Sequence, residues 1–271
     1  MIPRLWHAYD EFCSLVRASH PSGICDLRRL DWVYPTTLLP LGSFLIRTGG
    51  KCLPPTNPGV ADYISIMFGR RLQVVDPGKT YMPLVPLPRQ STDADRVLGH
   101  IYRLHDHGRL CGGESAFKYL IGEMVDNVYQ HSHFSNAFVM AQRYENKGFV
   151  EVAIVDDGVT IGESLRNAGF RTNEDSDAIV RVLAEGISAK GTDTRGYGIR
   201  SNASMFTVGL KGAVLIVSGR GAVELVSSER DGKVRQNNYR LEGGSSSLNG
   251  TLVSVRIPYP SGRVDIHDYT T

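Results

Sequence analysis

Three polar residues of different chemistry follow one another at intervals of four in the segment GEMVDNVYQHS, residues 122–132. Glu123 carries a carboxylate, Asn127 an amide and His131 an imidazole. That interval predicts one polar stripe on a helix over 114–131, beside an apolar face. The same stripe is typical of any amphipathic helix whose polar side faces water. Its meaning therefore depends on which other segments reach it.

Three later segments carry groups that could complete a ligand site. The strand in VAIVDDG ends at Asp156 and is followed by Gly158, so a carboxylate could accept a hydrogen bond from a flat amine such as that of adenine. In KGTDTRGYGIRSN, Gly196 and Gly198 lead into a helix whose first amides could bind phosphate. NGTLVSVRIP opens the last strand with Gly-Thr. Each segment alone also fits an ordinary turn.

The order of these segments resembles the GHKL ATPase superfamily of gyrase, the ninety-kilodalton heat-shock chaperones, histidine kinases and mismatch-repair ATPases. The resemblance covers residues 113–258: GEMVDNVYQHS resembles the N box, DDGVTI the first glycine box and RGYGIRS the second. It implies an α/β fold, a two-layer α/β sandwich of the GHKL (Bergerat) type over residues 91–271. It also implies that the domain binds ATP and Mg²⁺. Thr160 stands where the first glycine box usually has a second glycine, which leaves that loop's conformation open.

The resemblance assigns roles around the base and the metal. Asn127 is expected to coordinate a Mg²⁺ that bridges the phosphates. Glu123 is the candidate catalytic residue, which would orient or polarise the water or acceptor that attacks the γ-phosphate. Asp156 would recognise adenine, Gly158 would admit the ring, and Thr251 would support that contact through water.

It also assigns roles around the phosphates. Gly196 and Gly198 would present backbone amides, and His131 occupies the position of a basic phosphate neighbour. Lys190 and Arg195 are candidate phosphate contacts, with solvated loop cations as the other interpretation. We expect the polar stretch 159–195, which contains one helical segment, to act as a lid over the nucleotide.

Residues 1–90 are predicted to form a small α/β module, separated from the rest by a linker in the proline-rich stretch 76–92. The segment GICDLRRLDWVYPTTLLPLGSFLI resembles the strand, turn and helix of STAS-like regulatory modules, although any α/β domain could contain such a unit. In that resemblance Thr36 or Thr37 would accept phosphate. The alternative is that they cap the helix.

Composition excludes several classes of protein. The chain has 271 residues, 41% of them apolar, and a formal net charge of +2, so nothing in it indicates nucleic-acid binding. Four widely spaced cysteines indicate reduced thiols rather than a zinc site or a disulfide framework. No apolar run is long enough for a signal peptide or a membrane span, so we expect a cytoplasmic protein with a protein partner or substrate. A homo-oligomer is compatible with the sequence.

Two functions are consistent with these patterns. The first is a Mg²⁺-dependent ATPase or protein kinase of the GHKL type, acting in regulation or in stress or defence. The second is a non-catalytic switch, in which bound ATP orders the lid and controls a partner surface without turnover. The segment before the N box does not resemble the phosphoacceptor motif of a histidine kinase. Glu123 favours the enzyme.

Overall fold

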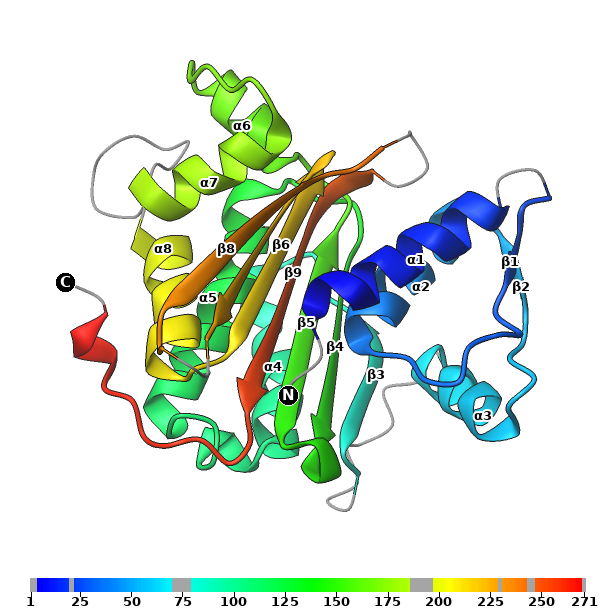
Figure 1. Ribbon diagram of the computed structural model, residues 1–271, viewed down its shortest axis with the longest axis horizontal. Helices are drawn as coiled ribbons and strands as arrows, with labels where there is room; N and C mark the ends of the chain where they lie inside the picture. The colour runs from blue at the N-terminus through cyan, green and yellow to red at the C-terminus, as the bar shows by residue number, and fades with distance from the viewer. Residues whose placement is uncertain are drawn as a thin grey trace.

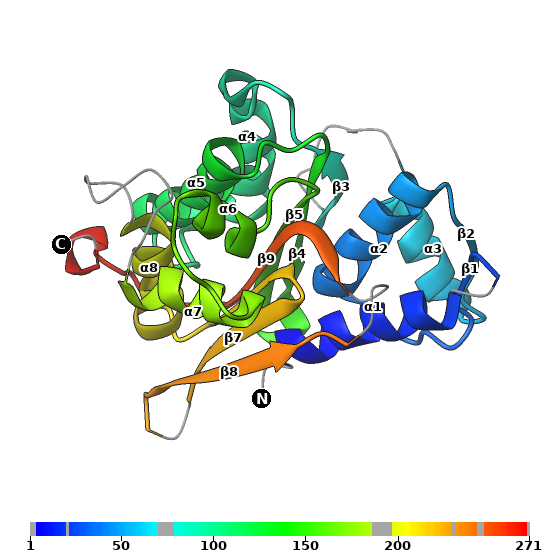
Figure 2. The same ribbon diagram turned by 90° about the horizontal axis from the view of Figure 1, so that it is seen from above.

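The computed structural model describes residues 4–19, 22–69, 79–185, 197–228, 231–242 and 247–269. Its centre is a seven-stranded sheet in the order β3-β4-β5-β9-β6-β7-β8, in which every neighbouring pair is antiparallel. A second, two-stranded sheet pairs β1 with β2 in parallel. Helices cover both faces of the large sheet (Figures 1 and 2). The protein is therefore a mixed α/β structure, as the sequence predicted.

The helices and strands range from three to eighteen residues in length. The helices are α1 (Leu5–Ser19), α2 (Pro35–Thr48), α3 (Pro58–Met67), α4 (Asp95–Leu104), α5 (Glu114–His131), α6 (Ile161–Asn167), α7 (Asp175–Glu185) and α8 (Tyr197–Ser204), which continues into a π-helical turn at Met205–Gly209. The strands are β1 (Ile24–Asp26), β2 (Lys51–Leu53), β3 (Tyr81–Pro86), β4 (Ala137–Tyr144), β5 (Phe149–Asp156), β6 (Ala213–Gly219), β7 (Gly221–Ser227), β8 (Val234–Arg240) and β9 (Leu248–Pro258).

Local sequence signals set several of these boundaries. Helix α5 spans the residues predicted for it, with its apolar residues buried against the sheet. Helix α3 begins at Pro58, and the preceding Asn57 accepts a hydrogen bond from the Gly59 amide at 3.1 Å. Proline has no backbone amide hydrogen, so it leaves no unpaired donor at the first position of a helix. The side-chain oxygen of an asparagine cap accepts a hydrogen bond from one of the next free amides. Asn57 is therefore the N-cap of α3.

The central strands are buried on both faces because each face has its own core. Along β5, Val150, Val152 and Ile154 pack toward α4 and α5, whereas Ala153 and Val155 pack toward α1 and α2. Side chains alternate between the two sides of a strand, so a strand covered on both sides is apolar throughout. This explains the continuous apolar run that predicted β5. We call the side toward α5 the inner face and the side toward α1 and α2 the outer face.

The two edge strands depart from the sequence prediction. Strand β3, Tyr81–Pro86, lies within the stretch predicted to be a linker and pairs with β4 although it contains two prolines. An edge strand tolerates proline because one of its sides needs no hydrogen-bond donor. Strand β8 at the opposite edge was not predicted, since its sequence VRQNNYR is polar and mostly exposed. The division into 1–90 and 91–271 stays a prediction.

Thr36 and Thr37 lie inside the protein, at the start of α2. Both are fully buried, and the N-cap position belongs to Tyr34, whose side chain makes no capping bond. The Thr36 backbone amide instead donates to the Glu151 carboxylate of β5 at 2.8 Å. Neither threonine is an accessible phosphate acceptor, and neither caps the helix with its own side chain.

Two further features bear on the environment of the chain. None of the helices in the described ranges is long and apolar enough to cross a membrane. All four cysteines are free thiols, and three of them, Cys13, Cys25 and Cys111, are buried.

Candidate functional site

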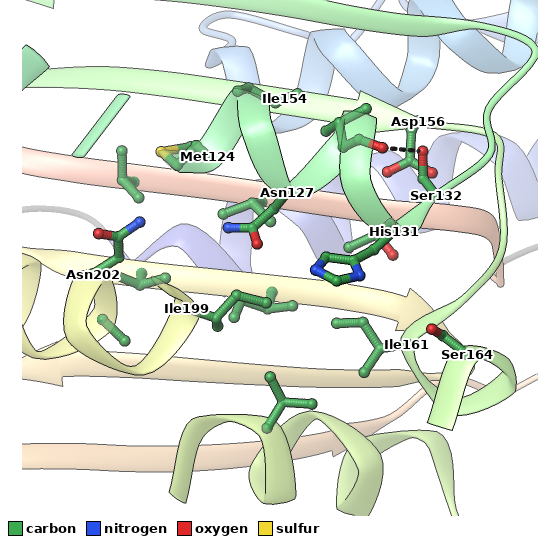
Figure 3. Close-up of a pocket in the computed structure, with 18 of the residues that line it drawn as sticks. Met124, Asn127, His131, Ser132, Ile154, Asp156, Ile161, Ser164, Ile199 and Asn202 are labelled. Carbon is green, nitrogen blue, oxygen red and sulfur yellow. Dashed lines mark hydrogen bonds between the residues drawn. The ribbon is translucent and has the colours of Figure 1, made fainter. Parts of the chain in front are cut away.

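A pocket lies between the inner face of the sheet and the helices α5, α6, α7 and α8. It is concave and open on one side, and its lining comes from α5, β5, α6, α7, α8, β6 and β9. Concave sites of this kind are where small-molecule ligands bind. Its walls are mostly apolar, and its polar groups are few. The polar lining residues are Asn127, His131, Ser132, Asp156, Ser164, Asn202 and Thr251. Figure 3 shows Asp156 and Asn202 toward opposite ends of the pocket, with Asn127 and His131 between them.

Helix α5 contributes two residues of the predicted polar stripe. Asn127 and His131 both line the pocket, as expected for residues one turn apart on the helix. The Asn127 amide nitrogen donates to the Glu123 carbonyl at 2.7 Å. This bond fixes the orientation of the amide, which leaves its oxygen as the atom suited to coordinate a cation.

Glu123, the third residue of the stripe, is not among the residues that line the pocket. Its side chain is half-buried, and burial, with a smaller contribution from Asp126, raises the pKa of its carboxyl group. A raised pKa suits a carboxylate that accepts a proton near neutral pH. The structure thus brings Asn127, His131 and Asp156 together and leaves Glu123 one helical turn outside.

Asp156 is the buried carboxylate of the pocket. It is 4% exposed, and its oxygens accept hydrogen bonds from the backbone amides of Gly158, at 2.9 Å, and Thr251. Burial raises the pKa of this carboxyl to about 7, against the smaller lowering effect of the two amide bonds. A cationic partner is absent from those contacts. A ligand donor would therefore be the group that best stabilises the ionised form.

Two glycines allow the backbone around Asp156 to pack closely. A Cβ atom on Gly158 would lie 1.9 Å from the carbonyl oxygen of Ser132. Gly250, with a φ of 116°, would place a Cβ 2.1 Å from the Asp156 carbonyl oxygen. Both positions require glycine because the opposing group is backbone that cannot rotate away. The need for Gly158 thus arises from packing on Ser132, while its contact with a ligand ring stays a prediction.

Thr251 belongs to a hydrogen-bonded group that the sequence did not indicate. Its hydroxyl lies 2.9 Å from the hydroxyl of Ser218 on β6. Ser218 also accepts from the Ile161 amide at 2.8 Å and lies 3.2 Å from the Gly250 carbonyl. Ser218 is fully buried. No motif singled out this serine, because its role depends on strand pairing between β6 and β9.

The stretch predicted to be a lid contains two helices, α6 and α7. Thr160, the residue that replaces a glycine of the resembled motif, is the N-cap of α6 and accepts from the Glu163 amide at 3.1 Å. Leu165, Ala178 and Val182 form a small core between the helices. This stretch therefore has a small hydrophobic core of its own, which its polar composition did not predict.

The predicted phosphate-binding residues fall mainly in the undescribed part of this stretch. Lys190, Arg195 and Gly196 lie outside the described residues. Gly198 lies in the first turn of α8, the helix predicted from YGIRSN. Their roles stay predictions.

Asn202 of α8 is a pocket residue that sequence reasoning missed. It is 5% exposed, and its side-chain oxygen has no hydrogen-bond partner. A buried amide without its full set of partners is costly unless something else supplies them. The segment RGYGIRSN drew attention to its glycines, and nothing in its spacing distinguished Asn202 from a surface residue.

The described residues contain no group of three or more histidine, cysteine, aspartate or glutamate side chains placed to hold a metal ion. No protein-family model matches the chain, and no curated protein matches it.

Proposed function

We propose that the protein binds ATP with Mg²⁺ in this pocket, as a GHKL-type ATPase or kinase of the Bergerat fold. The observation that carries the proposal is the buried Asp156 carboxylate beside Thr251, with Asn127 on the helix that closes the pocket. A flat amine could donate to Asp156 while the apolar walls contact its ring. Adenine presents both features.

The arrangement of elements supports the same proposal. Helix α5 precedes two antiparallel strands, and the second of them, β5, ends at Asp156. Helices α6 and α7 follow, and α8 then leads into β6 beside β9, which carries Thr251. Residues 91–271 thus supply a sheet with helices on its inner face, the layout expected of the Bergerat sandwich. The outer face is covered by residues 4–69.

The donor set suits Mg²⁺ that is bound mainly through the nucleotide. Mg²⁺ prefers oxygen ligands and retains several waters, so it often takes one or two ligands from the protein and the rest from phosphates. The Asn127 amide oxygen would be such a ligand, because Asn127 lines the pocket and its amide nitrogen is held by the Glu123 carbonyl. The bound cation would neutralise charge on the phosphates. Asn127 would hold it in place.

The test is binding of ATP by calorimetry at pH 8 with and without Mg²⁺. Asp156→Asn should weaken ATP by about 1–3 kcal/mol, because a ligand donor loses its charged acceptor. Asp157→Asn is the matched control: the Asp157 carboxylate accepts from the backbone of Ser135 and Asn136, outside the pocket. Equal ATP affinity of Asp156→Asn and the parent would show that this carboxylate does not bind the adenine base.

A second function, the non-catalytic switch, is favoured by the position of Glu123 outside the pocket lining. The two functions differ in the response of turnover to Glu123→Gln. If Glu123 acts as a general base, turnover should fall by about 10²–10⁴-fold with little change in ATP affinity. A parent protein that binds ATP but neither hydrolyses it nor transfers its phosphate, with partner present, would leave the switch as the function.

A further inference from the structure

Two of the four cysteines lie opposite each other in the two-stranded sheet. Strands β1 and β2 run in parallel, and their register pairs Cys25 directly with Cys52. Figure 1 shows this sheet at the end of the molecule that is remote from α6, α7 and α8. Neighbouring strands lie about 4.8 Å apart, and paired residues point to the same side of the sheet. That spacing falls within the Cα separations that a disulfide can span, about 4.4–6.8 Å.

The electrostatics of Cys25 agree with this register. Burial raises the pKa of the Cys25 thiol, a hydrogen bond with the Ser19 side chain opposes that rise, and repulsion from Cys52 adds to it. Cys52 affects the ionisation of Cys25 because the two sulfur atoms are near each other. Backbone pairing and thiol chemistry thus place both sulfur atoms at the same spot on the sheet, where rotation of the side chains can join them.

The two thiols differ in their access to solvent. Cys25 is fully buried and belongs to the core on the outer side of the sheet, whereas Cys52 is exposed. A dissolved oxidant therefore reaches Cys52 first. An oxidised cysteine with a second thiol beside it condenses with that thiol to form a disulfide. The sheet therefore holds an accessible thiol next to a sheltered one.

The other two cysteines have different surroundings. Cys13 lies on α1 within the outer core, and Cys111 lies in the inner core. Among the strand pairs in the described ranges, β1 with β2 is the one that sets two cysteines opposite each other. The arrangement of Cys25 and Cys52 therefore distinguishes them from a general population of buried thiols.

We propose that Cys25 and Cys52 form a reversible disulfide in response to hydrogen peroxide, with Cys52 oxidised first and Cys25 completing the crosslink. The Cys52 thiolate attacks one peroxide oxygen, so an S–O bond forms, the O–O bond breaks and hydroxide leaves. The Cys25 thiolate then attacks the Cys52 sulfur, so the S–S bond forms, the S–O bond breaks and a second hydroxide leaves. The two thiols lose two electrons and two protons, and the peroxide is reduced to two waters.

The crosslink would join both ends of residues 26–51, the segment that contains α2. This helix lies against the outer face, where the Thr36 amide at its start is bound to Glu151. Oxidation would therefore fasten the segment that covers the sheet on this side. The inference is independent of the proposed function, because neither cysteine lines the pocket.

The experiment treats the reduced full-length protein with hydrogen peroxide at pH 8, alkylates the remaining thiols and maps its peptides by mass spectrometry without reduction. The parent should give a peptide that links Cys25 to Cys52, lighter by two hydrogen atoms than its two parts, and dithiothreitol should abolish it. Burial raises the pKa of both thiols, so thiolate is scarce at neutral pH. The reaction should slow about tenfold for each unit by which the pH is lowered from 8 to 6.

Two variants and a control assign the order of events. In Cys25→Ala the Cys52 sulfenic acid has no thiol opposite it, so dimedone should label Cys52 strongly, whereas the parent should show little label. Cys52→Ser changes an exposed residue and should give neither the crosslink nor a dimedone adduct on Cys25. Cys13→Ala is the matched control, since Cys13 is a buried thiol of the same core, and it should form the crosslink at the parental rate.

Several results would overturn the inference. One is a peroxide-treated parent in which Cys25 and Cys52 stay unlinked. Another is a peptide that links Cys13 to Cys25, which would show that helix packing rather than strand register selects the pair. Dimedone labelling of Cys25 in Cys52→Ser would reverse the proposed order of oxidation. A protein that fails to bind ATP but forms the Cys25–Cys52 crosslink would contradict the proposed function and support this inference.

Discussion

The two faces of the large sheet bury carboxylates in opposite ways. On the outer face, Glu151 and Glu224 are fully buried. Each pairs with an arginine and also accepts a hydrogen bond from a backbone amide in the first turn of a helix. On the inner face, Asp156 is almost as buried, and among the described residues its carboxylate accepts from the backbone amides of Gly158 and Thr251 without a cationic partner. The outer carboxylates are therefore satisfied by the fold, whereas the inner one has capacity left for a ligand.

The outer carboxylates hold residues 4–69 against the sheet. Glu151 accepts from the Arg256 guanidinium at 2.6 Å and from the Thr36 amide at 2.8 Å, at the start of α2. Glu224 pairs with Arg4 and accepts from the Trp6 amide at 3.1 Å, at the start of α1. A carboxylate near the N-terminus of a helix is stabilised by the unpaired amides there. Both helices thus begin on a buried glutamate of the sheet.

The comparison teaches how to separate a structural buried charge from a functional one. Burial alone does not distinguish them, because all three carboxylates are nearly inaccessible to solvent. What differs is whether a residue in the described part of the chain provides a cationic partner. This difference gives each face its own expected response to mutation.

The largest effect is expected at the Arg256–Glu151 pair, both of whose side chains are fully buried. Arg256→Met leaves the Glu151 charge without its cation and should lower the free energy of unfolding by about 3–5 kcal/mol in urea titrations. Adding Glu151→Met should recover much of that loss. The matched control, Arg28→Met, breaks an exposed pair with Asp26 and should change stability little. Equal losses in Arg256→Met and Arg28→Met would contradict the comparison.

A smaller effect, dependent on pH, is expected at Asp156. Its pKa rises from the usual 3.8 to about 7 on folding, so the folded state retains a proton that the unfolded state releases. The ligand-free protein should therefore lose stability as pH rises from about 4 to about 7, by up to about 4 kcal/mol from this group. Asp156→Asn mimics the protonated form and should remove that loss. Urea titrations at several pH values measure the free energy of unfolding of both proteins. If it depends on pH in the same way in the parent and in Asp156→Asn, the pKa of Asp156 is not raised on folding.

The smallest effect is expected at Asn57, the N-cap of α3. Asn57 makes no contact described above with the buried carboxylates of either face. Asn57→Ala removes the acceptor for the Gly59 amide and should cost about 1 kcal/mol of stability. ATP affinity should stay at the parental value, because the cap belongs to the outer side of the sheet. A loss of ATP affinity in this variant would show that the two faces are coupled more tightly than their separate cores indicate.

Much of the fold is predictable from local patterns. Helix α5 shows an apolar face at helical spacing, and the buried strands β5 and β6 appear as apolar runs bounded by turn residues. Asn57 and Pro58 mark the start of α3. The end of a strand at Asp156 and the polar stripe that contains Asn127 are visible in the sequence as well, and the structure places both residues at one pocket. Only the family resemblance made Asn127 a candidate metal ligand. These signals act over a few residues, so they do not depend on the rest of the chain.

The tertiary structure alone decided the remainder. The edge strands β3 and β8 form through pairing with β4 and β7, since their own sequences contain prolines or polar residues rather than an apolar run. The contacts of Ser218 with Ile161 and Thr251 join residues 57 and 33 positions away, as the pairing of β6 with β9 requires. Residue type and local spacing therefore determined which groups could do chemistry. Which of them meet depends on contacts between strands and helices far apart in the chain, which local propensity does not specify.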